Sequence, residues 1–151
     1  MIHGKQHKTK GELEADIKQA VIQFEKEYMG RGPLETHVFI IEDMVLVRLL
    51  GVLTPSERKL AQADAAERGR DLIKQTRQEL LEQGRPLLEQ ALQTILYVKV
   101  KSLHTDISTQ TGERIIVFTL EARPEWREAE TILQRQKVNG KAGKKSSALK
   151  H

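Results

Sequence analysis

The chain of 151 residues is long enough for one domain with a buried core, and its 38% hydrophobic and 30% charged residues are typical of a folded protein. It contains no cysteine, which excludes disulfides, thiolate chemistry and any zinc site with a cysteine ligand. No apolar run approaches the roughly 20 residues that cross a bilayer, and the first residues lack the apolar core of a secretory signal. We therefore expect a cytoplasmic protein without a transmembrane segment.

The net charge of +4 is concentrated at the two ends of the chain. Residues 1–10 contain three lysines and no acid, and residues 137–151 contain five lysines and no acid. Residues 11–136 carry 17 basic and 21 acidic groups, a net charge of −4. Basic tails of this kind bind nucleic acid, an acidic protein or an anionic membrane weakly and in a salt-dependent way, or only keep the protein soluble.

A first helix is predicted over residues 11–29. Thr9 and Glu12 form a capping-box pattern, and apolar residues then recur at the spacing of one helical face. Gly30, Gly32 and Pro33 form the structural turn that ends the helix, because glycine adopts the left-handed conformation there and proline follows shortly after.

Two strands, residues 36–41 and 44–53, are expected to form a hairpin around Asp43. The second strand is apolar on both faces except at Arg48, which indicates a central strand or one that is covered twice. Further helices are predicted from Thr54 to about residue 66, over residues 70–83 and over 87–95. Gly69 and Pro86 are the expected interruptions between them.

A second hairpin is predicted from residues 97–109 and 114–120, with Gly112 in its turn. The apolar face of its first strand changes near Lys101 and Ser102, which predicts a β-bulge there. A short helix is expected within residues 123–136. The glycine-rich and lysine-rich residues 137–151 are typical of a disordered tail.

The element order α-β-β-α-α-β-β predicts the α+β class, with a four-stranded antiparallel sheet and long helices packed on one face. We expect a flexible basic N-terminus (1–10), a single domain (11–122), a short helix (123–136) and a disordered basic tail (137–151). The strands carry more apolar surface than one helix layer covers. This predicts a homo-oligomer, most simply a dimer, that uses the other sheet face or an edge.

A row of polar residues on the third strand is the first candidate site. Ser102, His104, Asp106 and Ser108 alternate with apolar residues and so share one face. Such neighbours lie about 6.5–7 Å apart along the backbone, so the row is not expected to form a Ser-His-Asp relay by itself. His104 and Asp106 are suitable metal ligands, but no second ligand pair accompanies them. We predict an interface or small-ligand contact, with no catalytic residue, metal or cofactor.

Two arginines are the other candidates. Arg31 lies between two glycines, but its turn follows a helix C-terminus, which repels anions, so a structural role is the favoured interpretation. Arg48 interrupts an apolar strand and requires water, an anion or a carboxylate. Ion pairing within the chain or between subunits is favoured, and the candidate partners are Asp43, Asp106 and Glu113.

Five separated segments resemble the MpsC-like family of small bacterial proteins: EKEYMGRGP (25–33), DMVLVR (43–48), GVLT (51–54), SLHTDIS (102–108) and TGER (111–114). The resemblance extends over about residues 11–121 and leaves both basic tails outside it. It implies a link to a sodium-translocating, membrane-potential-generating system with membrane and cytosolic partners. It supplies no catalytic residues.

The resemblance leads to the first hypothesis, a non-catalytic accessory or regulatory protein of a membrane ion or inorganic-carbon transport system. Such a protein would act through protein–protein contacts as a homo-oligomer, peripheral to the membrane through a membrane-transport partner. Two alternatives stay open. One is a nucleic-acid or nucleotide-binding regulator that uses the tail lysines weakly together with Arg31. The other is a small enzyme or metal site around His104 and Asp106.

Overall fold

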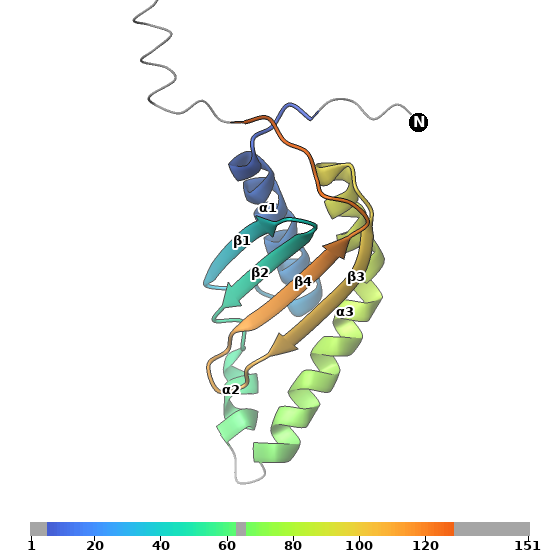
Figure 1. Cartoon of the computed structure of the whole chain (residues 1–151). Coiled ribbons are helices and arrows are strands. Elements are labelled where there is room, and N and C mark those ends of the chain that lie inside the picture. Colours follow the sequence, from blue (N-terminus) through green and yellow to red (C-terminus); the bar gives the residue numbers. More distant parts are fainter. Residues whose placement is uncertain (1–5, 63–65, 129–151) are drawn as a thin grey trace, which may run out of the picture.

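The structure is a computed structural model and describes residues 6–62 and 66–128. Its elements follow the predicted order (Figure 1). They are α1 (Lys10–Met29), β1 (Glu35–Ile41), β2 (Met44–Leu50), α2 (Pro55–Gln62), α3 (Ala66–Leu96), β3 (Val100–Ile107) and β4 (Arg114–Leu120). The α+β class predicted from the sequence is confirmed.

The four strands form one antiparallel sheet in the order β1-β2-β4-β3. The two hairpins therefore meet through β2 and β4, and β1 and β3 are the edges. Helices α1 and α3 lie against one face of this sheet, while α2 and the first part of α3 extend beyond its end (Figure 1). The core lies between the two long helices and the covered sheet face. Its buried side chains include Leu13, Ile17, Val21, Val45, Val47, Leu81, Leu88, Leu92, Ile116 and Phe118.

Local signals place both ends of α1 and the start of α2 where the sequence predicts them. Thr9 and Glu12 form a reciprocal capping box, and Gly30 ends α1 with a left-handed φ of 84°. Thr54 and Glu57 make the same reciprocal contacts at the start of α2. These signals act within a few residues, so they do not depend on the rest of the fold.

Helix α3 corrects the prediction of two interruptions, because it continues through Gly69 and Pro86. Gly69 and Gly84, which lies two residues before Pro86, permit close contacts because they have no Cβ. A Cβ at Gly69 would lie 2.2 Å from the carbonyl oxygen of Leu60, and a Cβ at Gly84 would lie 2.4 Å from Cε2 of Phe24. The buried packing of α3 outweighs the single backbone hydrogen bond that Pro86 removes.

The helix expected within 123–136 does not form in residues 123–128. The backbone N–H of Arg127 instead donates to the carbonyl of Lys8 at 2.9 Å, so it cannot make a helical bond. Residues 129–136 lie outside the described residues, and so does the predicted tail over 137–151.

The predicted bulge is confirmed, since the β3–β4 register shifts between Val100 and Ser102. The shift pairs Val100 with Leu120 and Ser102 with Thr119. The polar row of β3 is thereby placed on the sheet face opposite the helices.

Candidate functional site

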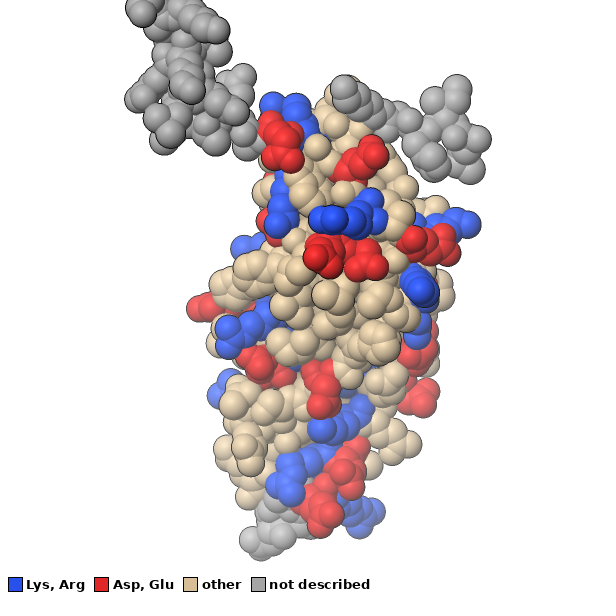
Figure 2. Space-filling view, in the orientation of Figure 1, with Lys and Arg blue, Asp and Glu red and all other residues tan. Residues whose placement is uncertain are grey.

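The sheet face opposite the helices, called the open face below, is apolar in its middle. The strand register aligns Phe39, Leu46, Val117 and His104 in one row across all four strands. No element of the described chain covers this row, and Phe39 remains 47% exposed. Uncharged side chains form a continuous area in the middle of this view of the molecule, with acidic and basic residues around it (Figure 2). The remaining side chains of the open face are Glu35, His37, Ile41, Met44, Arg48, Leu50, Ser102, Asp106, Ile115 and Thr119.

Both edges of the sheet are partly closed by carboxylates. On β1, the backbone N–H of Ile40 donates to Glu14 of α1 at 2.8 Å. On β3, the N–H of Ile107 donates to the side chain of Asp106 at 2.8 Å. Free N–H groups on an edge strand recruit further strands, so these contacts disfavour strand addition at Ile40 and Ile107.

The polar row of β3 brings together two of the three side chains that a Ser-His-Asp relay requires. Ser102 Oγ lies 3.2 Å from His104 Nε2, a contact that the sequence analysis did not expect. Asp106 bonds instead to Ile107 and to Lys74 Nζ of α3, at 3.2 Å. The pKa of Asp106 lies below its usual value, first because of the Ile107 N–H and then because of Lys74. The carboxylate that would orient the histidine is thus engaged elsewhere.

The two candidate arginines lie apart from this row. Arg48 Nε donates to Glu113 Oε2 at 2.7 Å, which confirms the expected ion pair and selects one of its three candidate partners. Arg31 donates to the carbonyl of Gly51 at 2.9 Å and so connects the turn after α1 to the end of β2. Gly112, in the turn before β4, has a left-handed φ of 75°, in agreement with its structural role. The structure does not bring the predicted candidates together in one pocket.

A second cluster, which the sequence analysis missed, lies inside the protein. Glu25 of α1, Arg77 of α3 and Arg114 of β4 are 1–3% exposed, and Glu57 of α2 completes the cluster. Arg77 binds Glu57 through two nitrogens, at 2.8 and 2.7 Å, and also donates to the carbonyl of Val52 at 2.8 Å. We call these four residues the buried charge cluster.

Glu25 lies between the two arginines but is not hydrogen-bonded to either. Its carboxylate oxygens are 3.9 Å from Arg77 Nη1 and 3.7 Å from Arg114 Nη1. Burial raises the pKa of Glu25, and the two arginines offset this only in part. Burial also acts to raise the pKa of Glu57, but hydrogen bonds from Arg77 and Thr54 outweigh it and hold that pKa below its usual value.

Helical spacing is the sequence signal for the buried charge cluster. Glu25 follows Val21 by four residues, and Arg77 lies four residues from both Ile73 and Leu81, so both charges fall on apolar stripes. A charged residue on such a stripe requires a buried partner. The identity of that partner depends on how the helices pack, which spacing does not reveal.

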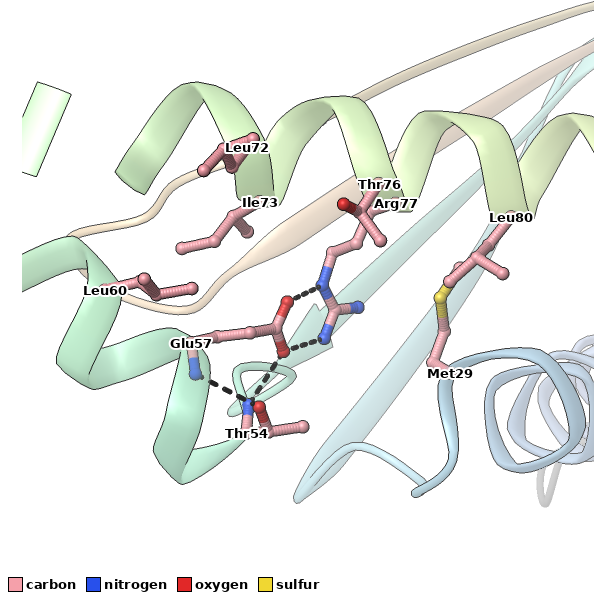
Figure 3. A pocket seen from close by; sticks show the side chains of 9 residues that line it. All are labelled: Met29, Thr54, Glu57, Leu60, Leu72, Ile73, Thr76, Arg77 and Leu80. Atoms are coloured by element: carbon pink, nitrogen blue, oxygen red, sulfur yellow. Dashed lines mark hydrogen bonds and ion pairs between the residues drawn. The ribbon is translucent and has the colours of Figure 1, made fainter. Parts of the chain in front are cut away.

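A cavity of about 290 Å³ borders the cluster between α2, α3 and the end of α1 (Figure 3). The guanidinium of Arg77 faces the carboxylate of Glu57 on one wall, and two threonines, Thr54 and Thr76, line the cavity together with apolar side chains. The apolar side chains come from Met29, Leu60, Leu72, Ile73 and Leu80. The polar wall is occupied by an internal ion pair, which gives this wall a structural explanation.

Within residues 6–62 and 66–128, no three His, Asp or Glu side chains are grouped so that they could hold a metal ion. None of the described helices combines the length and the apolar character needed to cross a bilayer.

Comparison with known proteins identifies relatives of the domain. The family model described as "Na+-translocating membrane potential-generating system (MpsC)" matches residues 9–122. A Bacillus subtilis (strain 168) protein, "Uncharacterized protein YbcI", is 43% identical over 113 residues, which is 75% of this chain and 89% of that protein. No solved structure matches the chain.

The first prediction concerns the buried charge cluster. Arg77→Met should lower the free energy of unfolding by about 3–5 kcal/mol, because it leaves the buried carboxylate of Glu25 and the partly buried carboxylate of Glu57 without their shared cation. Arg85→Met, on the surface of the same helix, removes contacts with Glu82 and Glu89 and should cost less than about 1 kcal/mol. Urea unfolding of both variants measures the difference. Equal losses would contradict the role assigned to the cluster.

The second prediction concerns the pH dependence of stability. The pKa of Glu25 is raised in the folded protein, so folding favours its protonated form, and the associated stability is lost as the pH rises through the folded pKa. Glu25→Gln removes this loss. Its unfolding free energy relative to the wild type should therefore rise from pH 4.5, the ordinary value for glutamate, and level off above the folded pKa.

Unfolding curves of both proteins across this range measure the difference. A difference that stays constant or falls with rising pH would contradict the raised pKa of Glu25.

Proposed function

Because this chain belongs to the MpsC family, we propose that it is a non-catalytic accessory or regulatory protein of a sodium-translocating, membrane-potential-generating transport system. It acts on the cytoplasmic side through protein–protein contacts and reaches the membrane through its transport partner. The description of the family supports the choice of system. The observation that carries the mode of action is the uncovered apolar row on the open face.

The open face has the properties of a contact surface for protein. Phe39 and Ile41 are 47% and 45% exposed on β1, and Leu46 and Val117 beside them are only partly covered. Covering apolar area favours association, although the lost translational, rotational and side-chain freedom offsets much of this gain. Because carboxylates occupy N–H groups on both sheet edges, contact by the face is favoured over strand addition.

We assign a second copy of the chain as the occupant of the open face. A two-fold axis parallel to the strands, between β2 and β4, places β1 of one copy over β3 of the other. His37 on β1 then lies opposite Asp106 on β3, with which it can hydrogen-bond. Leu46 lies opposite Val117, so the apolar middle of the face meets an apolar partner, while Arg48, paired with Glu113 in its own chain, lies opposite Ile115.

The size of the face predicts a weak dimer. Four strands of about seven residues cover roughly 440 Å² in projection, or roughly 900 Å² for two copies. This lies at the low end of specific interfaces, where association is reversible and depends on concentration. A dimer that forms and dissociates with changes in concentration is suited to a regulatory component.

The proposal assigns no catalytic step to the polar row of β3. Ser102 and His104 contact each other, but Asp106 is bonded to Lys74 and Ile107. In the proposed dimer these side chains form one border of the interface.

The third prediction uses Phe39→Glu, which places a carboxylate in the middle of the proposed interface. Desolvating this charge should weaken the dimer at least tenfold in dissociation constant. Leu87→Glu is the matched control, because Leu87 is an exposed leucine on α3, outside the open face. Sedimentation equilibrium across a range of concentrations measures both, with circular dichroism to verify folding.

The same variants test the proposed function in bacteria that carry them in place of the wild-type gene. With sodium as the principal external cation, Phe39→Glu should lower the membrane potential to the level of a gene deletion, whereas Leu87→Glu should not. A potential-sensitive dye reports the difference. A deletion strain with an unchanged potential would contradict the proposed system, and a monomeric wild type would contradict the proposed dimer.

A further inference from the structure

The cavity between α2, α3 and the end of α1 has the size and the enclosure of a small-molecule site. Its volume of about 290 Å³ is roughly twice that of an engineered cavity in another protein that admits benzene. Two of its lining residues, Ile73 and Arg77, are each 3% exposed, whereas Leu60 and Leu72 are 44% and 47% exposed. The cavity is therefore closed on the side of the core and open to solvent beside the two leucines.

Two contacts between α2 and α3 hold the cavity in shape. The guanidinium of Arg77 binds the carboxylate of Glu57 through two nitrogens and so links the helices on one side (Figure 3). Nearer the start of α3, the backbone of Leu60 lies so close to Gly69 that a Cβ there would clash with its carbonyl oxygen. An empty cavity shrinks when its surroundings relax, and these two contacts oppose that relaxation. The cavity is thus preformed, as ligand sites usually are.

The lining favours an apolar ligand without a net charge. Among the nine lining residues labelled in Figure 3, five have apolar side chains and two are charged. The two charged residues, Glu57 and Arg77, neutralise each other through hydrogen bonds of 2.7 and 2.8 Å. An ionised ligand in this cavity would lose its water without gaining a counter-charge. Thr76, which is exposed at the edge of the cavity, supplies a hydroxyl that donates or accepts a hydrogen bond.

We propose that this cavity binds a small, uncharged molecule with an apolar body of about two fused rings and one hydroxyl or carbonyl group. The apolar body lies against Leu60, Leu72 and Leu80, and the polar group bonds to Thr76. Affinity comes mainly from removing the exposed leucine surface from water. The cavity lies among the helices and not on the open face (Figure 1), so this inference stands or falls separately from the proposed dimer.

Equilibrium dialysis of the full-length chain against 2-naphthol, which is uncharged at neutral pH and has two fused rings, provides the test. The wild type should bind 2-naphthol with a dissociation constant below about 1 mM. Two analogues carry a charge on the same rings: 2-naphthoate is an anion, and 2-naphthylmethylammonium is a cation. Both should bind at least tenfold more weakly, because the cavity offers neither of them a counter-charge.

Three variants locate the site. Leu72→Glu places a carboxylate at the mouth of the cavity and should weaken the binding of 2-naphthol at least tenfold. Leu87→Glu changes another exposed leucine of α3, outside the cavity, and should alter binding less than twofold. Thr76→Val should weaken the binding of 2-naphthol about fivefold but leave that of naphthalene unchanged, because naphthalene makes no hydrogen bond. Circular dichroism verifies that each variant folds.

Several results would overturn the assignment. A wild type that does not bind 2-naphthol, or that binds a charged analogue equally well, would contradict an uncharged ligand. Equal losses in the Leu72 and Leu87 variants would place binding elsewhere, and equal losses of naphthalene and 2-naphthol in Thr76→Val would remove the contact with that hydroxyl. If Leu72→Glu abolished dimer formation in sedimentation equilibrium but kept 2-naphthol binding, the occupant would be a second copy of the chain.

Discussion

Arg77 connects the three described helices to one another and to the end of β2. It binds Glu57 of α2 through two nitrogens, lies within 3.9 Å of Glu25 of α1 and donates to the carbonyl of Val52 after β2. These groups are buried or partly buried, so each requires the others, and a displaced helix would leave an unpaired charge. The buried charge cluster thereby connects α1, α2 and α3 to β4 and to the end of β2 on the side of the sheet that the helices cover.

The open face follows from this asymmetry and limits how the protein makes contacts. One helix layer covers the face of Val45, Val47, Ile116 and Phe118, while the row of Phe39, Leu46 and Val117 has no cover within the described residues. Carboxylates at both edges disfavour extension of the sheet. A reversible face-to-face contact is the association that these constraints favour.

Local signals made much of the fold predictable from the sequence. The two capping boxes, the left-handed Gly30 and the bulge before Ser102 each depend on a few neighbouring residues, and all appear as expected. Features set by distant contacts were not predictable. The continuity of α3 depends on buried packing, and the glycine before Pro86 serves the contact with Phe24 rather than a helix end.

In the candidate site, too, local sequence patterns predicted some features, whereas features set by distant contacts were not predictable. Arg48 and Glu113 were a foreseeable pair, because a charge in an apolar strand requires a nearby carboxylate. The side chain of Asp106 could not be placed, because its partner Lys74 comes from a helix 32 residues earlier. The buried charge cluster was missed because its members come from four separate elements, and only two of them carry a spacing signal.

The central claim is that protein covers the open face in the cell. A photoreactive phenylalanine analogue at position 46, in the middle of that face, tests it most directly when the bacteria are irradiated. Our account predicts cross-linked homodimers from position 46 and none from position 87 on α3. Equal cross-linking from both positions, or none from position 46, would contradict it.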